Sequence, residues 1–459
     1  MTPLDADTTR AGERDSVQSS LVYGIDERPA SWWETVLYGW QHTLVDISPF
    51  VLPLAVASAI GMSAGDTIRF INFCLFSMGV ATLLQTTVGN RLPIIQGPSA
   101  TLTGVLAPVA ARLGPGAMWG AAFAGGLIEM AVGASRLLSA VRRVFPPAVA
   151  GVVILTIALA LGRLAVRLTV GGGEAMNFAL AAAVIGSVGF LHTRCRFAWG
   201  GLLTRAAIFF TIWTLGLGAG SLLGRVDWAL VAGRPWLAPP RLFPFGGPGF
   251  GWEFAPAAIL AVLAGYFGSI IESIGDYAAT CTVAGETYTA RHMNRGIFAE
   301  GLGSALATAM GGLPCTSYTQ NIGIIAATRV ASRTVVRVAA CVLLLYGLSP
   351  KFGALLVAMP RSVLGGVFVL VCGMIAVSGM RLLKMAPDTP ANRFVVGTTL
   401  IVSVGVPTYV SFTLGASWLE ALPPLVALVL TNPVVLAVLL GVILNLLLDS
   451  AAGEAEGTA

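Results

Sequence analysis

The stretch Arg91-Leu92-Pro93-Ile94-Ile95-Gln96-Gly97-Pro98-Ser99 interrupts a long series of apolar segments and decides the fold. Two prolines and a glycine prevent an uninterrupted helix here, so we expect 94–96 to be extended and Pro98 to lie in the first turn of the next helix. Irregular backbone is tolerated at membrane depth only around a cavity that is buried in protein or filled with water. The stretch therefore predicts a broken membrane span beside such a cavity.

A second interruption lies in the other half of the chain, at Gly311-Gly312-Leu313-Pro314-Cys315-Thr316-Ser317-Tyr318-Thr319-Gln320-Asn321. It repeats the Leu-Pro pair, which is followed by hydroxyl-bearing residues and then by an apolar run. The two interruptions belong to the third and tenth predicted spans, which are corresponding places in two seven-span halves. Such a pair is typical of a transporter's substrate site. The alternative is that each interruption is only the place where a loop at the membrane surface leads into a helix.

The composition is that of a membrane protein. Apolar and aromatic residues account for 56% of the 459 residues and charged residues for only 11%, whereas a soluble domain carries about 25% charge. At about 20 residues per crossing, the length accommodates roughly fourteen spans. The strands of a membrane barrel alternate apolar and polar residues, but runs such as 152–161 and 436–448 are apolar on all sides. We predict an all-α polytopic membrane protein.

The apolar runs predict where the spans lie, with a further interfacial stretch at 418–430. The predicted spans are 36–59, 67–89, 92–112, 115–134, 146–168, 176–193, 203–224, 254–279, 294–311, 313–328, 334–349, 362–380, 393–412 and 433–448. With the N-terminus inside, the inner loops hold most of the arginine and lysine, which is the positive-inside pattern. We expect a protein of the cell membrane with cytoplasmic tails at 1–35 and 450–459.

Other classes of function find little support in the sequence. The basic residues behind the formal charge of +5 are scattered between apolar runs, so no nucleic-acid partner is expected. The six cysteines have no paired spacing, which indicates packing residues and not disulfides or a metal site. No Gly-x-x-x-x-Gly-Lys phosphate loop is present, and no nucleophile–base pair is visible. We predict a protein that is not an enzyme and has neither cofactor nor metal.

Few ionisable residues fall within the spans, and each is costly enough there to suggest a function. Glu272 and Asp276 are four residues apart and share one helix face. Burial and the neighbouring like charge disfavour ionising both, so one of them could bind and release a proton near neutral pH. A structural acid bonded to a neighbouring helix is the alternative. Glu300 in the ninth span is interpreted as a brace for the nearby interruption, and Glu129 in the fourth has no assigned role.

Amide and imidazole side chains accompany these acids. Gln320 and Asn321 follow the second interruption. A neutral amide offers both an acceptor and donors, which suits the edge of a heterocyclic ligand, although hydrogen bonding between helices is the alternative. Gln41 and His42 are adjacent in the first span. His42 is either a coupling or a packing residue, and Asp46, one turn beyond, could pair with it.

The run Gln320-Asn321-Ile322-Gly323-Ile324-Ile325-Ala326-Ala327-Thr328-Arg329 resembles the signature of the nucleobase–ascorbate transporter family. That signature reads Gln, Glu or Pro, then Asn-x-Gly, four residues, Thr and a variable position. Three further features of the family appear in order: the pair Gln41-His42, the stretch Glu272-Ser273-Ile274-Gly275-Asp276-Tyr277, and the acidic ninth span Ala299-Glu300-Gly301-Leu302-Gly303. The resemblance covers residues 36–448.

This resemblance implies fourteen spans arranged as two inverted seven-span repeats. The implied core domain comprises 36–135 and 254–349, and the implied gate domain comprises 146–224 and 351–449. The core would move against the gate in an elevator-type mechanism, usually within a homodimer.

The resemblance also implies the site. Glu272 and Gln320 would hydrogen-bond the base, and Tyr318 would stack on its ring. The backbone near Ser99 and Ala100 would add contacts. The supporting residues, which would hold this geometry and couple it to the ion, are Asp276, Glu300, His42, Gln41, Asn321 and Thr328.

The substrate is left with alternatives. The first signature position is Gln in purine carriers, Glu in uracil carriers and Pro in animal ascorbate carriers, so Gln320 favours a purine such as xanthine or uric acid, with uracil next. Ala100 stands where many members have an aromatic residue, which removes a stacking face worth about 1 kcal/mol. We expect proton symport. The alternatives are sodium coupling, ascorbate transport and an anion exchanger of the same fold.

Overall fold

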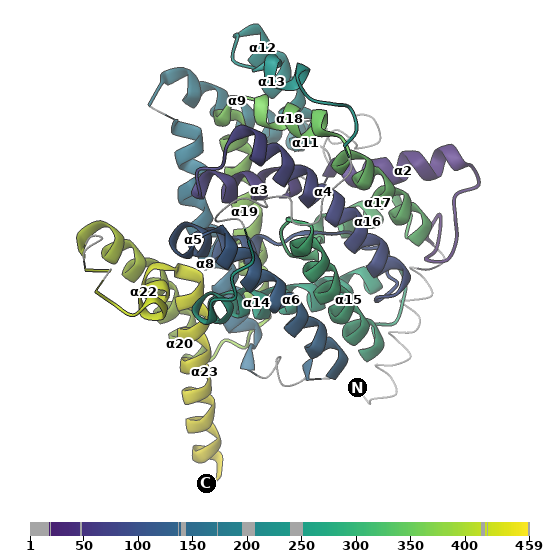
Figure 1. Cartoon of the computed structure of the whole chain (residues 1–459). Helices are drawn as coiled ribbons and strands as arrows, with labels where there is room; N and C mark the ends of the chain where they lie inside the picture. The colour runs from purple at the N-terminus through teal and green to yellow at the C-terminus, as the bar shows by residue number, and fades with distance from the viewer. Residues whose placement is uncertain are drawn as a thin grey trace.

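The computed structural model describes residues 18, 20–45, 48–135, 137–138, 144–171, 173–194, 207–238, 251–414, 418–419 and 421–457, and these are mostly helical (Figure 1). Two short strands interrupt the helices, and η denotes a π-helical segment. The elements are α2 (Trp32–Val45), α3 (Ser48–Ala59), α4 (Ala64–Thr87), β1 (Gln96–Pro98), α5 (Ala100–Leu113), α6 (Pro115–Ser135), α8 (Pro147–Val170), α9 (Ala175–Arg194), α11 (Ala207–Thr211), η2 (Ile212–Ala219), α12 (Gly220–Leu222), α13 (Trp228–Ala232), α14 (Pro256–Val283), α15 (Ala290–Ala309), β2 (Cys315–Ser317), α16 (Thr319–Thr328), α17 (Arg333–Gly347), α18 (Pro350–Ala358), α19 (Arg361–Met385), α20 (Pro390–Tyr409), η3 (Val410–Leu414), α22 (Pro424–Thr431) and α23 (Pro433–Gly457).

Several helices are long and apolar enough to cross a membrane. Seven of the described helices meet this condition: α4, α6, α8, α9, α14, α19 and α20 together with η3. Two further pairs, α17 with α18 and α22 with α23, are bent by 75° and 95° at short breaks and would bring the number to nine if each pair is one span. The protein is therefore a multi-pass membrane protein. Each of the fourteen predicted spans contains helix, but the count of fourteen crossings stays a prediction.

The helices pack mainly on partners far away in the sequence. α8 packs along α19, and α20 and α23 pack on α8 and on each other. Elsewhere α6 packs along α15 and α4 along α17. Figure 1 shows α23, in yellow, projecting from the other helices toward the C-terminus. The first of these groups falls within the range predicted for the gate and the second within that predicted for the core. Their division into two moving domains remains a prediction.

The two strands bring the two interruptions together. β1 and β2 pair antiparallel, with Gln96 opposite Ser317 and Pro98 opposite Cys315. Flanking backbone bonds extend the pairing, because Tyr318 N–H donates to the carbonyl of Ile95 at 3.0 Å. Both strands are fully buried. Since each backbone supplies the other's hydrogen-bond partners, irregular chain can lie inside the membrane protein without unpaired groups.

The predicted position of the first extended stretch was wrong by two residues. The strand covers Gln96–Pro98 and not 94–96, and Pro98 lies in the strand instead of the first helical turn. Ser99 is the residue that caps the following helix. The reason is the pairing across the two halves, because the register that places Pro98 opposite Cys315 keeps Pro98 extended. Proline at the end of a short strand is compatible with that position.

α6 and α15 approach each other closely at a glycine. A Cβ added to Gly301 would lie 2.3 Å from the backbone nitrogen of Met130. Glu300 precedes Gly301 in α15, and Glu129 precedes Met130 in α6. The close crossing therefore brings two buried glutamates onto facing turns.

Gly301→Ala is expected to destabilise the protein by about 1–3 kcal/mol, because the added methyl meets backbone that cannot swing aside. Gly275→Ala on α14 is the matched control. A Cβ there would meet nothing within 4 Å, and alanine is favoured over glycine in a helix by about 1 kcal/mol. Thermal unfolding of both purified variants checks the prediction. Equal unfolding temperatures would show that α6 and α15 do not pack this closely.

Candidate functional site

Two short helices begin where the strands end. Ser99 caps α5, and its hydroxyl accepts a hydrogen bond from the backbone of Leu102 at 3.2 Å. α16 begins at Thr319, directly after β2 and Tyr318. Because the strands are antiparallel, the two helices leave the strand pair in opposite directions and their N-termini flank it. Helix N-termini carry free N–H groups and partial positive charge, so this region suits a polar ligand.

A cavity of about 50 Å³ lies beside the strand pair. It is lined by Pro98, Ala100, Glu272, Thr316, Ser317, Tyr318, Thr319, Gln320, Val371, Met374, Ile375 and Ser378. Four of the five residues predicted to contact substrate, Glu272, Gln320, Tyr318 and Ala100, therefore share one cavity. The fifth, Ser99, is buried as a helix cap and does not line it. The volume corresponds to roughly two water molecules, which is less than a purine requires.

Glu272 and Asp276 each bond to a different short helix. The hydroxyl of Thr101 in α5 donates to Oε2 of Glu272 at 3.1 Å. One turn further along α14, Oδ1 of Asp276 accepts from the hydroxyl of Thr319 in α16 at 2.8 Å. Oδ2 of Asp276 is buried without a hydrogen-bond partner among the described residues. The two acids thus fix α14 against both helices that begin at the strands.

Glu300 lies at the centre of a buried hydrogen-bond network. The hydroxyl of Ser273 lies 2.6 and 2.8 Å from its two carboxylate oxygens. The hydroxyls of Tyr277 and Ser317 donate to Oε2 at 2.8 and 3.1 Å. Glu300 itself has no exposed surface. This one side chain therefore joins α14, α15 and β2, and its role as a brace for the interruption stays a prediction.

Two glutamines that are not among the predicted site residues extend this network. The amide of Gln96 in β1 donates to the hydroxyl of Ser317 at 2.7 Å. The amide of Gln85 in α4 donates to the hydroxyl of Tyr277 at 2.7 Å and to the carbonyl of Gly296 at 3.2 Å. Each glutamine lies in an apolar segment, where an amide is costly unless it forms hydrogen bonds. This is the sequence signal that could have identified both residues.

Glu129, whose role the sequence left open, is buried close to this network. It is 1% exposed, and neither carboxylate oxygen has a hydrogen-bond partner in the part of the chain that the structure describes. Over the same residues, no group of three or more His, Cys, Asp or Glu side chains could hold a metal ion. The five described cysteines are free thiols.

His42 and Asn321 bond to each other, at 2.7 Å between Nδ1 and Oδ1, and both are buried. This contact joins α2 to the first turn of α16. Gln41 is half-buried and does not line the cavity. The hydroxyl of Thr328 bonds to a backbone carbonyl at the far end of α16, so it ends the helix and does not reach the cavity. Asp46 lies outside the described residues.

The ring of Tyr318 lies directly against Gly97. A Cβ on Gly97 would be 2.6 Å from the tyrosine oxygen and 2.7 Å from the ring carbon that bears it. The hydroxyl donates to the carbonyl of Pro98 at 3.0 Å. The strand therefore needs glycine at this position, because any side chain would displace an aromatic ring that lines the cavity.

One wall of the cavity comes from α19, which contains none of the predicted site residues. Val371, Met374, Ile375 and Ser378 lie on this helix. α19 is apolar along most of its length, so no residue pattern distinguishes the side that faces the cavity. The cavity lies between α19, in the predicted gate, and the strands, α14 and α16, in the predicted core.

The fold is similar to that of solved membrane transporters. The transmembrane domain of a cyanobacterium bicarbonate transporter, BicA, matches with a TM-score of 0.54 and 18% identity over 92% of this chain and 99% of that one. The murine Slc26a9 anion transporter in its inward-facing state matches with a TM-score of 0.59 and 11% identity over 93% of this chain and 69% of that one. At such identities the likeness shows a shared fold and does not indicate the substrate of this chain.

The sequence relatives are more informative. The uric acid permease PucK of Bacillus subtilis is 30% identical over 82% of this chain and 87% of its own length. The xanthine permease XanQ of Escherichia coli K12 is 28% identical over 94% of both chains. A family model described as the permease family matches residues 33–447, which confirms the prediction that the protein is not an enzyme. The chain belongs to this permease family, the nucleobase–ascorbate transporter family that its signature at 320–329 predicts.

Proposed function

We propose that the protein is a secondary transporter that imports a nucleobase, with a purine such as xanthine or uric acid favoured and uracil next. The observation that carries this proposal is that Glu272 and Gln320 line one cavity. A carboxyl group and a neutral amide together supply donors and acceptors, which match the mixed edge of a purine. The names of the relatives, xanthine and uric acid permeases, support the same class of substrate.

The remaining lining residues suit the faces of a flat ring. Tyr318 supplies an aromatic ring, and Met374 and Ile375 of α19 supply apolar surface. Ala100 lines the cavity where many family members have an aromatic residue, so we infer a looser fit on that side. Such a site would bind the edge of the base through hydrogen bonds and its faces through apolar contact.

The cavity must widen to admit a base. Its present 50 Å³ holds roughly two waters, and its walls belong to both predicted domains. Movement of α14 and the strand pair away from α19 would enlarge it. This supports an elevator-type mechanism in which the core (36–135 and 254–349) moves against the gate (146–224 and 351–449). We place this mechanism in a homodimer of fourteen-span, inverted-repeat subunits in the cell membrane, with both termini cytoplasmic.

Ile375→Trp is expected to abolish nucleobase binding, because the larger side chain fills a cavity that is already small. Val377→Trp is the matched control, since Val377 lies two residues away on α19, is 43% exposed and does not line the cavity. Binding of labelled xanthine to the purified variants checks the prediction. If Ile375→Trp bound xanthine as tightly as Val377→Trp, the substrate would have to bind outside this cavity.

Proton coupling is the second part of the proposal. Glu272 is half-buried in the membrane part of the protein and lines the cavity, so its carboxyl could load a proton together with the base. Uptake of labelled xanthine or uracil into cells, with and without a protonophore, tests this. If accumulation survived the protonophore but required sodium, the substrate site would stand and sodium would be the coupling ion instead of the proton.

Gln320→Glu is expected to change the preference between xanthine and uracil by about tenfold or more, because a mismatched hydrogen bond to a buried group costs about 1–3 kcal/mol. Competition of both bases against labelled substrate measures the preference. The amount of folded protein, measured by size-exclusion chromatography, should be nearly unchanged because Gln320 lines the cavity. An unchanged preference between xanthine and uracil would show that Gln320 does not distinguish the bases.

A further inference from the structure

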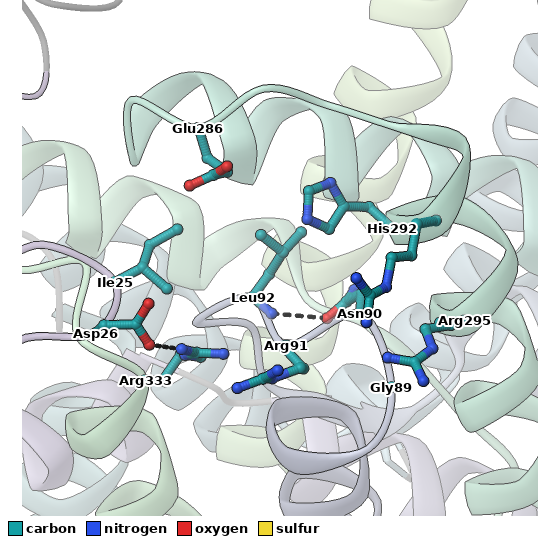
Figure 2. A pocket seen from close by; sticks show the side chains of 11 residues that line it. Ile25, Asp26, Gly89, Asn90, Arg91, Leu92, Glu286, His292, Arg295 and Arg333 are labelled. Carbon is teal, nitrogen blue, oxygen red and sulfur yellow. Dashed lines mark hydrogen bonds and ion pairs between the residues drawn. The ribbon is translucent and has the colours of Figure 1, made fainter.

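A second cavity, of about 210 Å³, is shown in Figure 2. It is formed by the segment before α2, the loop between α4 and β1, the loop before α15 with the first turns of that helix, and the start of α17. None of its lining residues also lines the cavity beside the strands. The second cavity is therefore a separate feature, and nothing in the proposed transport mechanism accounts for it.

The lining of this cavity is strongly basic. Four arginines, Arg91, Arg291, Arg295 and Arg333, face only two carboxylates. One carboxylate, that of Asp26, forms an ion pair with Arg333, which Figure 2 marks with a dashed line. Within the described ranges the other three arginines have no ion pair. The cavity thus has an excess of positive charge.

Two helix ends add to this charge. Arg291 and Arg295 lie in the first two turns of α15, and Arg333 is the first residue of α17. The N-terminus of a helix carries partial positive charge, so cations are disfavoured at this end. The positive-inside pattern explains basic residues on this side of the membrane, but it does not require them to gather around one cavity at two helix N-termini. An anion in the cavity would offset both effects.

Asn90 supplies an independent indication of a ligand. It lines the cavity and is 4% exposed. Its Oδ1 accepts a hydrogen bond from the backbone of Leu92 at 3.0 Å (Figure 2). Its Nδ2 is buried with no hydrogen-bond partner among the described residues. A buried donor without an acceptor is costly, and a small shift of this side chain toward a ligand that accepts hydrogen bonds would satisfy it.

We propose that this cavity binds a phosphate group, either free inorganic phosphate or the phosphate of an anionic lipid headgroup. The planar fork of a guanidinium group matches two phosphate oxygens, and the amide of Asn90 adds a neutral donor. The volume equals roughly seven waters, which accommodates one phosphate group. It is smaller than the pockets of about 300–1,000 Å³ that hold drug-sized ligands.

Thermal unfolding of the full-length protein tests the proposal and separates the two sources. One arm titrates inorganic phosphate into detergent-purified protein against chloride of equal ionic strength. The other compares nanodiscs of phosphatidylcholine with and without phosphatidylglycerol. A ligand that binds only the folded state raises the unfolding temperature. Saturable stabilisation by phosphate supports the free ion, and stabilisation by phosphatidylglycerol supports the headgroup. The absence of both effects would overturn the proposal.

Three variants establish where the stabilising ligand binds. Arg295→Gln and Asn90→Leu are each expected to lower the affinity about tenfold or more, because each removes a donor to a charged group. Arg381→Gln is the control, since this arginine is exposed on α19, removes the same charge and does not line the cavity. Arg295 is also exposed, so its replacement should not impair folding. Equal losses in Arg295→Gln and Arg381→Gln would overturn the assignment to this cavity.

Discussion

Replacing Glu272 with glutamine is expected to abolish accumulation of the nucleobase while leaving the protein folded. Glutamine has nearly the same size and can still accept the hydrogen bond from Thr101, which is 3.1 Å in the present structure. It cannot bind and release a proton. One proton entering down a potential of 100 mV supplies about 2.3 kcal/mol, which corresponds to about 50-fold accumulation of an uncharged base. The variant is expected to lose this accumulation, so the concentration of the base inside should at most equal that outside.

The ratio of labelled xanthine inside and outside proteoliposomes, under an imposed proton gradient, measures this effect. Glu253→Gln is the control, because it makes the same substitution at an exposed carboxyl that does not line the cavity. The control should accumulate xanthine normally. If Glu272→Gln did so as well, the proton would have to be carried by another residue, and the assignment of Glu272 as the coupling group would be wrong.

Glu300→Leu is expected to remove most of the folded protein. The carboxylate of Glu300 accepts hydrogen bonds from the hydroxyls of Ser273, Tyr277 and Ser317. Leucine would remove this acceptor. The hydroxyl of Ser273 still has that of Thr316 at 3.0 Å, but the buried hydroxyls of Tyr277 and Ser317 would be left without an acceptor. Each orphaned group costs about 1–3 kcal/mol, so the two together cost roughly 2–6 kcal/mol. The free energy of unfolding of a typical domain is only about 5–15 kcal/mol.

Glu129→Leu provides a matched control for this prediction. Both glutamates are buried and lie on facing helices, but the oxygens of Glu129 have no hydrogen-bond partner among the described residues. Replacing such a group with an apolar side chain is expected to be neutral or stabilising. Size-exclusion profiles and unfolding temperatures of the two variants should therefore move in opposite directions or differ widely. Similar losses in both would mean that the hydrogen bonds to Glu300 contribute little.

Local chemistry explains why much of the fold was predictable. Apolar runs mark the membrane segments, and the prolines and glycines of 91–99 and 311–321 mark the two interruptions. The pairing of the interruptions was not predictable from these signals, because it joins Gln96 to Ser317, which are 221 residues apart. The error of two residues in the first strand has the same origin. A short strand takes its register from its partner, and the partner lies in the other half of the chain.

The candidate site likewise contains residues that could be predicted from the sequence and residues that could not. Glu272 and Gln320 could be selected because ionisable and amide groups are costly inside a membrane and therefore conspicuous in an apolar sequence. The wall formed by Met374 and Ile375 could not, because an apolar residue that faces a cavity has the same chemistry as one that faces lipid. The placement of Ser99 depends on a detail of helix capping, which decides whether its hydroxyl faces the cavity or the backbone.

The long separation of the paired strands has a consequence for biosynthesis. A ribosome adds about 5–20 residues per second, so roughly 10–45 s pass between the emergence of Gln96 and that of Ser317, its partner 221 residues later. During that interval the backbone groups of β2 that pair with β1 have not yet been synthesised. The pairing of β1 with β2, and the part of the structure that depends on it, can therefore form only after translation has passed Ser317.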